Sequence, residues 1–207
     1  MKVAIIGAGN VGRALAGAAR RAGHEVTISA KHADHAAEAA SQTGATAVAS
    51  SREGVADADI VVLAVPVTAL DEVVSELSAG VSGKPVIDVT NRPTPDPAGQ
   101  VTSSAAEGVQ ARLPEARVVK AFNTVFASNQ ANPVVDGVPL DGYVAGDDDR
   151  AKQTVLEFVK SIGFRPIDVG PLFMARTLEA LGWLNISLNM NNKWPWQTGW
   201  KLVGRTQ

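Results

Sequence analysis

The chain has 207 residues, enough for one α/β domain and a small appendage but not for two full domains. Hydrophobic residues make up 45% and charged residues 19%, a balance typical of a packed globular protein rather than a disordered one. A formal net charge of −2 favours neither nucleic acid nor an anionic membrane as a partner, and the absence of cysteine excludes disulfides, thiol nucleophiles and thiolate metal sites.

The first residues run directly into a strand-like segment, without the charged and apolar regions of a secretion signal. The longest apolar runs, such as residues 60–67, are too short to span a bilayer. We therefore expect a soluble, cytoplasmic protein with no membrane partner.

Short β-branched runs alternate with helical patterns along most of the chain. We expect strands at residues 2–6, 25–30, 46–49, 59–65, 85–90, 117–122, 143–145 and 165–169, and helices at residues 11–22, 34–42, 70–77, 105–112 and 149–162. Residues 91–104, rich in proline, glycine and serine, form the longest expected loop. Such alternation predicts an α/β fold of the Rossmann type, with a doubly wound parallel sheet.

The pattern changes after residue 170. One helix from Pro171 to about residue 189 is followed by a tail, and all four tryptophans lie in this region: Trp183, Trp194, Trp196 and Trp200. They could pack the tail onto the sheet or onto a second subunit, or they could wall a pocket for a flat ring. We expect residues 1–170 to form a nucleotide-binding domain. Residues 171–207 should form a short helical, Trp-rich extension that supplies a second-cofactor pocket, a homodimer contact, or both.

A glycine-rich turn follows the first expected strand and precedes the first helix. The six residues that fit G-x-G-x-x-G are Gly7, Ala8, Gly9, Asn10, Val11 and Gly12. The first glycine permits the tight turn, the second lets the backbone approach a pyrophosphate, and the third allows close packing of helix on strand. In this context the motif predicts a dinucleotide whose pyrophosphate lies at the helix N-terminus.

The end of the second strand indicates which dinucleotide is bound. NAD-binding sites usually carry a carboxylate there, but this chain has Ser29, Ala30, Lys31 and His32. A hydroxyl and two basic side chains suit the 2′-phosphate of NADP, although an ordinary polar loop would look the same. Val65 and Pro66, after the fourth strand, should line the path of the cofactor, or Pro66 could simply begin the next helix.

Candidate acid or base residues are scarce. The three histidines, His24, His32 and His35, all lie near the second strand, and Lys120 lies within a strand, where we expect its amine to reach solvent. Residues 147–149 are all aspartate and should cap a helix instead of binding a metal. We therefore expect neither a catalytic side chain nor a metal site. Hydride transfer directly between two cofactor rings needs neither.

Several motifs along the chain point to a family. They are residues 7–12, Val65-Pro66, the segment 118–124 (VVKAFNT), the segment 145–149 (AGDDD) and the segment 168–172 (DVGPL). With these motifs the chain resembles the F420H2:NADP oxidoreductases, NADPH-dependent reductases of the deazaflavin coenzyme F420, and more distantly the oxidoreductase domain of the STEAP metalloreductases.

This resemblance implies roles for particular residues. It implies that residues 8–11 surround the pyrophosphate and that Ala30 and Lys31 meet the 2′-phosphate. It places Asn91, Ala121, Phe122 and Asn123 beside the nicotinamide and the second ring. The implied cofactors are NADP(H) and F420, or FMN or FAD in place of F420. Two other functions stay open: a flavin or ferric reductase, and a non-catalytic NADP-binding sensor.

Overall fold

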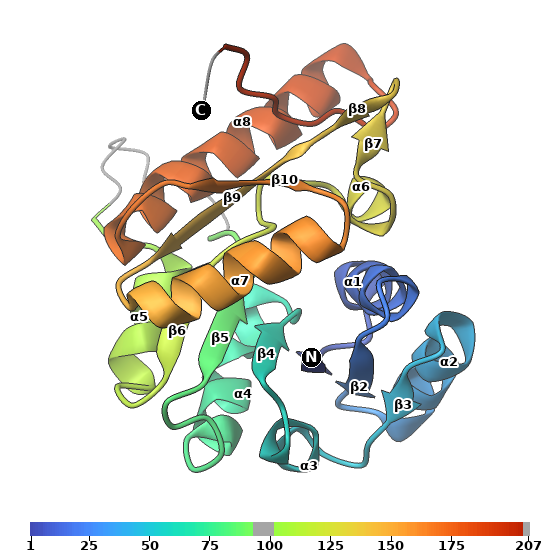
Figure 1. Cartoon of the computed structure of the whole chain (residues 1–207), viewed down its shortest axis with the longest axis vertical. Helices are drawn as coiled ribbons and strands as arrows, with labels where there is room; N and C mark the ends of the chain where they lie inside the picture. The colour runs from blue at the N-terminus through green and yellow to red at the C-terminus, as the bar shows by residue number, and fades with distance from the viewer. Residues whose placement is uncertain (93–101, 205–207) are drawn as a thin grey trace.

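The computed structural model describes residues 1–92 and 102–204. Eight of its strands form one sheet in the order β10-β9-β6-β5-β4-β1-β2-β3 (Figure 1). These strands are β1 (Lys2–Ile6), β2 (Glu25–Ser29), β3 (Thr46–Ala47), β4 (Ile60–Leu63), β5 (Pro85–Asp88), β6 (Arg117–Lys120), β9 (Asp141–Gly146) and β10 (Arg165–Asp168). A separate hairpin consists of β7 (Val134–Val135) and β8 (Val138–Pro139).

Helices cover both faces of this sheet (Figure 1). They are α1 (Asn10–Arg21), α2 (Ala33–Thr43), α3 (Ser51–Ala56), α4 (Leu70–Leu77), α5 (Ala105–Arg112), α6 (Ala127–Ala131), α7 (Asp149–Ser161) and α8 (Ala175–Asn192), with the 3₁₀ turns η1 (Val67–Ala69) and η2 (Leu172–Met174). In β1, Val3 and Ile5 pack towards α1, α2 and α7, whereas Ala4 and Ile6 pack towards α3, α4 and α5. Because successive side chains point to opposite faces, a strand buried on both faces must be apolar throughout.

The Rossmann-like α/β fold expected from the sequence is confirmed with a mostly parallel sheet, and only the pairing of β9 with β6 departs from the parallel arrangement. Strands β3, β2, β1, β4, β5 and β6 are parallel. Strand β9 runs antiparallel to β6, and β10 pairs in parallel with β9. A parallel connection from β6 would need a long crossover, and the segment between β6 and β9 carries only the five-residue helix α6 and the hairpin.

The elements missed from the sequence are short. Helices α3 and α6 have six and five residues, too few for a helical period to show in the sequence. The helix expected from Pro171 begins only at Ala175, after η2, and extends to Asn192. Most of the loop expected at residues 91–104 lies outside the described residues.

The tail after α8 is held against the start of β9. The Trp200 carbonyl accepts a hydrogen bond from the Asp141 amide, and the Asp141 carboxylate accepts from the Leu202 amide at 2.6 Å and from Arg165. Within the described ranges, no helix combines the length and apolar character that crossing a membrane requires.

Candidate functional site

The turn after β1 can be built only with glycine at two of its positions. Gly7 has a φ of 116°, and a Cβ there would lie 2.2 Å from the Ala64 carbonyl oxygen, beside β4. A Cβ at Gly12 would lie 1.9 Å from the carbonyl oxygen of Gly7. At Gly9, by contrast, no atom from a more distant part of the described chain lies within 4 Å of the Cβ position. The turn is therefore closed on the protein side and open at Gly9, where a ligand can approach the backbone.

Helix α1 begins at this turn with its N-terminus free to bind an anion. Gly9 is the N-cap, Asn10 is the first helical residue, and no side chain of the described residues caps the helix. The first amide groups of a helix lack partners within the helix, and the helix dipole favours negative charge beside them. The Ala8 carbonyl accepts a hydrogen bond from Arg13 Nε at 2.9 Å, and the Arg13 guanidinium also binds Glu38 of α2. Arg13, which the sequence analysis did not single out, fixes the turn.

The end of β2 lies next to this turn. The Ser29 carbonyl accepts a hydrogen bond from the Gly7 amide at 2.9 Å, and the buried Ser29 hydroxyl has no partner in the described part of the chain. Ala30 is half-buried, whereas Lys31 and His32 are exposed. Lys31 Nζ lies 3.2 Å from a carboxylate oxygen of Glu72 in α4, a partner that the sequence analysis did not foresee. A phosphate at Lys31 would have to share the ammonium group with this carboxylate.

Two asparagines meet at the ends of β5 and β6. Asn91 Nδ2 donates to the Asn123 carbonyl at 3.0 Å, and Asn123 Nδ2 donates to Asn91 Oδ1 at 2.8 Å. Phe122 has a φ of 64°, a backbone conformation that is unusual for a bulky residue. Its ring packs 6.0 Å from that of Phe158 and 5.7 Å from that of Phe164, measured between centroids. The packed ring fixes the strained backbone of Phe122, next to which Asn123 meets Asn91.

A cavity of about 180 Å³ opens beside this asparagine pair. It is lined by Val11, Val89, Asn91, Phe122, Asn123, Thr124, Val125, Phe126, Ala127, Gln130, Gly182 and Ile186. The predicted residues Val11, Asn91, Phe122 and Asn123 are thus brought together. The buried Ala121 is not in this lining. Neither are Val65, Pro66 and residues 29–32, which lie at the carboxyl ends of β4 and β2, at the same edge of the parallel strands.

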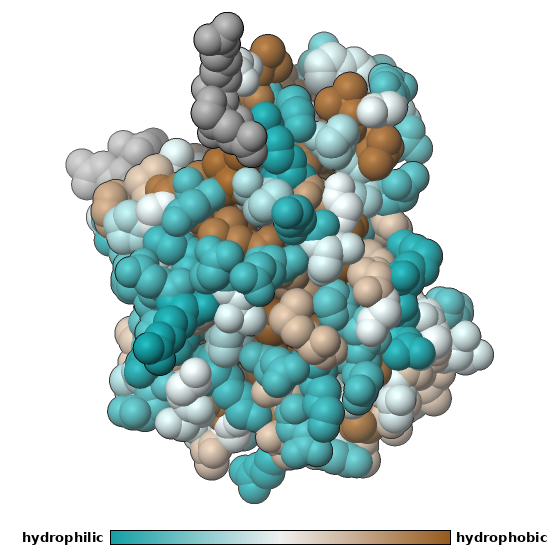
Figure 2. All heavy atoms as spheres, viewed as in Figure 1, coloured by the Kyte–Doolittle hydropathy of each residue, from teal (hydrophilic) through white to brown (hydrophobic). Residues whose placement is uncertain are grey.

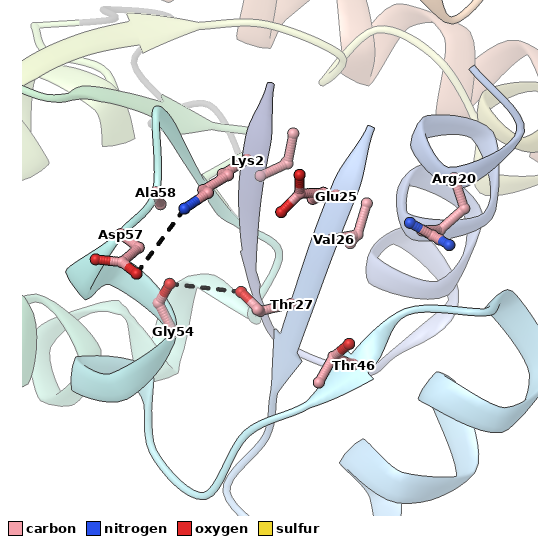
Figure 3. Close-up of a pocket in the computed structure, with 10 residues that line it drawn as sticks. Lys2, Arg20, Glu25, Val26, Thr27, Thr46, Gly54, Asp57 and Ala58 are labelled. Atoms are coloured by element: carbon pink, nitrogen blue, oxygen red, sulfur yellow. Dashed lines mark hydrogen bonds and ion pairs between the residues drawn. The ribbon is translucent and has the colours of Figure 1, made fainter. Parts of the chain in front are cut away.

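A larger hollow of about 260 Å³ lies at the opposite edge of the sheet (Figure 3). Lys2 and Glu25, at the beginnings of β1 and β2, line it. Its ion pair, Lys2 with Asp57, is long at 3.9 Å and exposed. Ligands of open parallel sheets bind beyond the carboxyl ends of the strands, so the smaller cavity next to the glycine turn is the candidate site.

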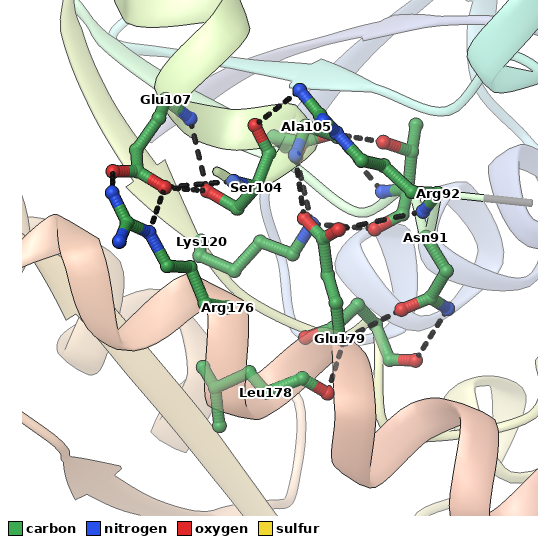
Figure 4. A network of polar contacts seen from close by, with 12 residues as sticks. Asn91, Arg92, Ser104, Ala105, Glu107, Lys120, Arg176, Leu178 and Glu179 are labelled. Atoms are coloured by element: carbon green, nitrogen blue, oxygen red, sulfur yellow. Dashed lines mark hydrogen bonds and ion pairs between the residues drawn. The ribbon is translucent and has the colours of Figure 1, made fainter. Parts of the chain in front are cut away.

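Lys120 does not reach solvent, contrary to the expectation from the sequence. Its amine is fully buried and lies 2.8 Å from Asp88 Oδ2 and 2.7 Å from Glu179 Oε1 (Figure 4). Asp88 and Lys120 face each other in the register of β5 and β6, and Glu179 comes from α8. A buried ammonium is stable only when such partners replace water. In the sequence, Asp88 and Lys120 stand at the ends of two apolar strand segments, and this pair of opposite charges could have indicated a buried ion pair.

Helix α8 also contacts the chain on both sides of residues 93–101, at Arg92 and at the start of α5. Glu107 of α5 accepts two hydrogen bonds from Arg176, at 2.8 and 2.6 Å, and completes a capping box with Ser104. Chiefly because of Arg176, the pKa of Glu107 falls from 4.5 to about 2. On the other flank, the Arg92 carbonyl accepts from Trp183 Nε1 at 2.6 Å.

Two of the tryptophans make different contacts. Trp183 donates a hydrogen bond to the backbone at Arg92, while Trp196 packs edge-on against Phe126 of the cavity wall, with ring centroids 5.2 Å apart.

The expected helix cap among the aspartates is confirmed at Asp148, whose side chain accepts a hydrogen bond from the Ala151 amide.

Comparison with known proteins identifies relatives of this chain. Residues 2–92 match the family described as NADP oxidoreductase coenzyme F420-dependent. The chain is 34% identical, over 212 residues, to the F420-dependent NADP reductase of Methanothermobacter thermautotrophicus, with 93% of this chain and 91% of that protein covered. It is 31% identical over 184 residues to the metalloreductase STEAP3 of Rattus norvegicus, and this match covers 87% of the chain but only 36% of STEAP3.

A solved structure from Arthrobacter sp. FB24, assigned provisionally as an F420-dependent NADP reductase, superposes with a TM-score of 0.86. It shares 29% identity, and the match covers 99% of this chain and 100% of that one. The archaeal relative is matched over nearly its whole length, and the Arthrobacter structure has the same fold throughout. The chain therefore belongs to the family of F420-dependent NADP reductases, which are NADP-dependent oxidoreductases.

Proposed function

We propose that this protein transfers hydride between NADP(H) and the deazaflavin ring of coenzyme F420, bound against the nicotinamide. The observation that carries the proposal is the continuity of the glycine turn with the cavity, since Val11 belongs to both. A dinucleotide with its pyrophosphate at α1 can extend into that cavity along the carboxyl edge of the sheet. Family membership supports the choice of cofactors.

Each predicted residue has a place in this proposal. Residues 7–12 bind the pyrophosphate, and residues 29–32 meet the ribose and its 2′-phosphate. Val65 and Pro66 line the path of the cofactor towards the nicotinamide, which Asn91 and residues 121–123 flank.

The cofactors supply the hydride donor and the hydride acceptor, and the chain aligns the two rings and excludes water. Among the described residues that line the cavity, none is ionisable. A reaction that needs alignment more than proton transfer fits such a site.

The test is NADPH oxidation by the purified protein with F420, and separately with FMN and FAD. We expect fast turnover with F420 and slow or no turnover with the flavins. Reduction of flavins with no reduction of F420 would refute the proposed acceptor. Tight NADPH binding without turnover with any ring would instead indicate a sensor.

The match to STEAP3 favours one second candidate, an NADPH-dependent flavin reductase that passes electrons to ferric iron. A flavin can release electrons singly, which a deazaflavin does not do readily. Ferric reduction that requires both NADPH and added FMN or FAD would support this function, and its absence would exclude it. For either function we propose a cytoplasmic location, which cell fractionation would check.

A further inference from the structure

Two residues of the cavity wall each carry a buried amide oxygen that has no hydrogen-bond partner in the described part of the chain. Asn123 is 7% exposed and Gln130 is 1% exposed, and both residues belong to the cavity wall. In the described part of the chain, neither Asn123 Oδ1 nor Gln130 Oε1 accepts a hydrogen bond. Because buried acceptors are nearly always satisfied in folded proteins, these two oxygens indicate a missing donor.

The orientation of the Gln130 amide follows from its neighbours. Gln130 Nε2 donates to the Phe122 carbonyl at 3.1 Å and to the Val125 carbonyl at 3.0 Å. Carbonyl oxygens can only accept, so a flipped amide would place its oxygen against two other acceptors. The free atom of Gln130 is therefore the oxygen.

The Asn123 amide is fixed in the same way. Its Nδ2 donates to the Leu178 carbonyl at 2.8 Å and to Asn91 Oδ1. Asn91 cannot flip either, because its own Nδ2 donates to the Asn123 carbonyl. The free atom of Asn123 is again the oxygen.

Both amides are held rigidly before any ligand binds. The positive φ of Phe122 fixes a carbonyl that holds Gln130. On the other side, α8 approaches through Gly182, where a Cβ would lie 2.9 Å from Asn91 Oδ1 and 3.0 Å from the Asn123 carbonyl oxygen. The absence of a side chain at Gly182 lets α8 pack directly on the asparagine pair. Acceptors held in this way can select a ligand at little cost in ordering.

We propose that Asn123 Oδ1 and Gln130 Oε1 accept hydrogen bonds from the amide N–H of a planar heterocycle. The rest of the nearby wall includes apolar side chains, such as Val89 and Ile186, that can flank a flat ring. Two groups carry this chemistry in the function proposed above, on which this inference rests: the carboxamide of nicotinamide and the pyrimidine N–H of the deazaflavin. A ring without the N–H would leave the two oxygens buried and unpaired, so the pair sets specificity.

The first experiment compares the binding of NADPH with that of the reduced 3-acetylpyridine analogue of NADP. The analogue replaces the carboxamide by an acetyl group and thus lacks the N–H. Binding to the intact protein without a second cofactor is followed by nucleotide fluorescence. We expect NADPH to bind at least about 10-fold more tightly than the analogue. In Gln130→Met, which keeps the length of the side chain but removes the acceptor, this ratio should fall towards one.

The ratio separates recognition from structural damage, because the two nucleotides share every other group. Gln110→Met is the matched control. Gln110 of α5 donates to the Leu113 and Ala116 carbonyls, away from the cavity, so its loss should alter stability without altering the ratio.

The second experiment compares F420 with a deazaflavin methylated at the pyrimidine nitrogen. A preference for F420 that Gln130→Met removes would assign the oxygens to the second ring. The proposal is overturned if the unmodified protein discriminates in neither pair, if it binds neither class of ligand, or if Gln110→Met changes the ratio as much as Gln130→Met. If the protein binds NADPH more tightly than the analogue but does not reduce F420, the inference is supported and F420 is refuted as the hydride acceptor.

Discussion

Gly9 and Gly12 belong to the same turn, but a side chain would meet different surroundings at each. At Gly9 the described chain leaves the Cβ position open, so Gly9→Ala should fold with a stability close to that of the unmodified protein. The new methyl group would stand where the pyrophosphate approaches the backbone, and we expect NADPH affinity to fall at least about 10-fold. Urea unfolding and NADPH titration measure the two effects.

Gly12→Ala is the matched comparison for this prediction. Its Cβ would clash with the Gly7 carbonyl, so the substitution should destabilise the fold by about 1–3 kcal/mol. Unchanged NADPH binding by Gly9→Ala would show that the pyrophosphate does not lie at this turn.

Lys31 is the charged residue to which we assign the proposed preference for NADP. Its ion pair with Glu72 is exposed and contributes little to stability, about 0–1 kcal/mol at most. Lys31→Ala should therefore weaken the binding of NADPH and leave that of NADH nearly unchanged. Glu72→Gln should strengthen NADPH binding by about 2- to 5-fold, because the 2′-phosphate no longer competes with a carboxylate.

We expect the unmodified protein to bind NADPH at least about 10-fold more tightly than NADH, which corresponds to about 1.4 kcal/mol. Equal dissociation constants for the two nucleotides would contradict the assignment of the 2′-phosphate to residues 29–32.

Among the elements, α8 is joined to the sheet through the buried lysine. Lys120→Met would leave the carboxylates of Asp88 and Glu179 buried without their cation, at a cost of about 3–5 kcal/mol. The triple variant Lys120→Met, Asp88→Asn, Glu179→Gln carries no buried charge at this place and should regain most of the loss. Chemical denaturation measures the stability of both variants. If Lys120→Met alone is as stable as the unmodified protein, Lys120 does not stabilise the contact between α8 and the sheet.

The contact between α5 and α8 makes stability depend on pH. The folded protein holds the pKa of Glu107 at about 2, against 4.5 for a free side chain, chiefly through Arg176. The unfolded chain therefore binds the proton first as the pH falls. The contribution of Glu107 is complete above about pH 4.5 and is lost between there and about pH 2.

Glu107→Gln should accordingly flatten the decline of unfolding free energy across this acidic range. Some decline should persist, because the pKa of Asp141 is also lowered, against the opposing effect of burial, by its contacts with Arg165, the Leu202 amide and Lys201. If the free energy of unfolding depends on pH identically in Glu107→Gln and in the unmodified protein, the ionisation of Glu107 does not contribute to stability.

The sequence predicted those elements whose pattern is local and long enough to recognise. The helix at Ala105–Arg112 and the strand at Lys2–Ile6 were predicted with their observed bounds. The antiparallel direction of β9 was not predictable in this way, because it results from the pairing of β9 with β6, which no local pattern encodes. The same distinction holds for the candidate site. The glycine turn is a local motif, whereas the Lys120–Glu179 contact joins residues 59 positions apart.

Over the molecule as a whole, exposed apolar side chains gather in the C-terminal half. Except for Met1, every large hydrophobic residue that is exposed in the described chain comes from the β7–β8 hairpin, η2, α8 or the tail. Figure 2 shows brown surface in the upper part of the view, where Figure 1 places α8, the β7–β8 hairpin and the tail. Helix α8 buries polar residues beside apolar ones. With Ala175, Leu178 and Gly182 it buries Glu179, Asn185 and Asn189, while Leu184 and Met190 are exposed.

We propose that this outward face of α8 forms a homodimer contact, as expected from the composition of the extension. Leu184 is 49% and Met190 63% exposed, and large exposed apolar side chains are frequent at protein interfaces. Leu184→Glu with Met190→Glu should convert a dimer to a monomer in sedimentation velocity, because charge is excluded from interface cores. Ala37→Glu, on the exposed side of α2, adds a charge elsewhere and should leave the dimer intact. A protein that sediments as a monomer before any substitution would refute the contact. A dimer that survives both α8 substitutions would place the interface on another face.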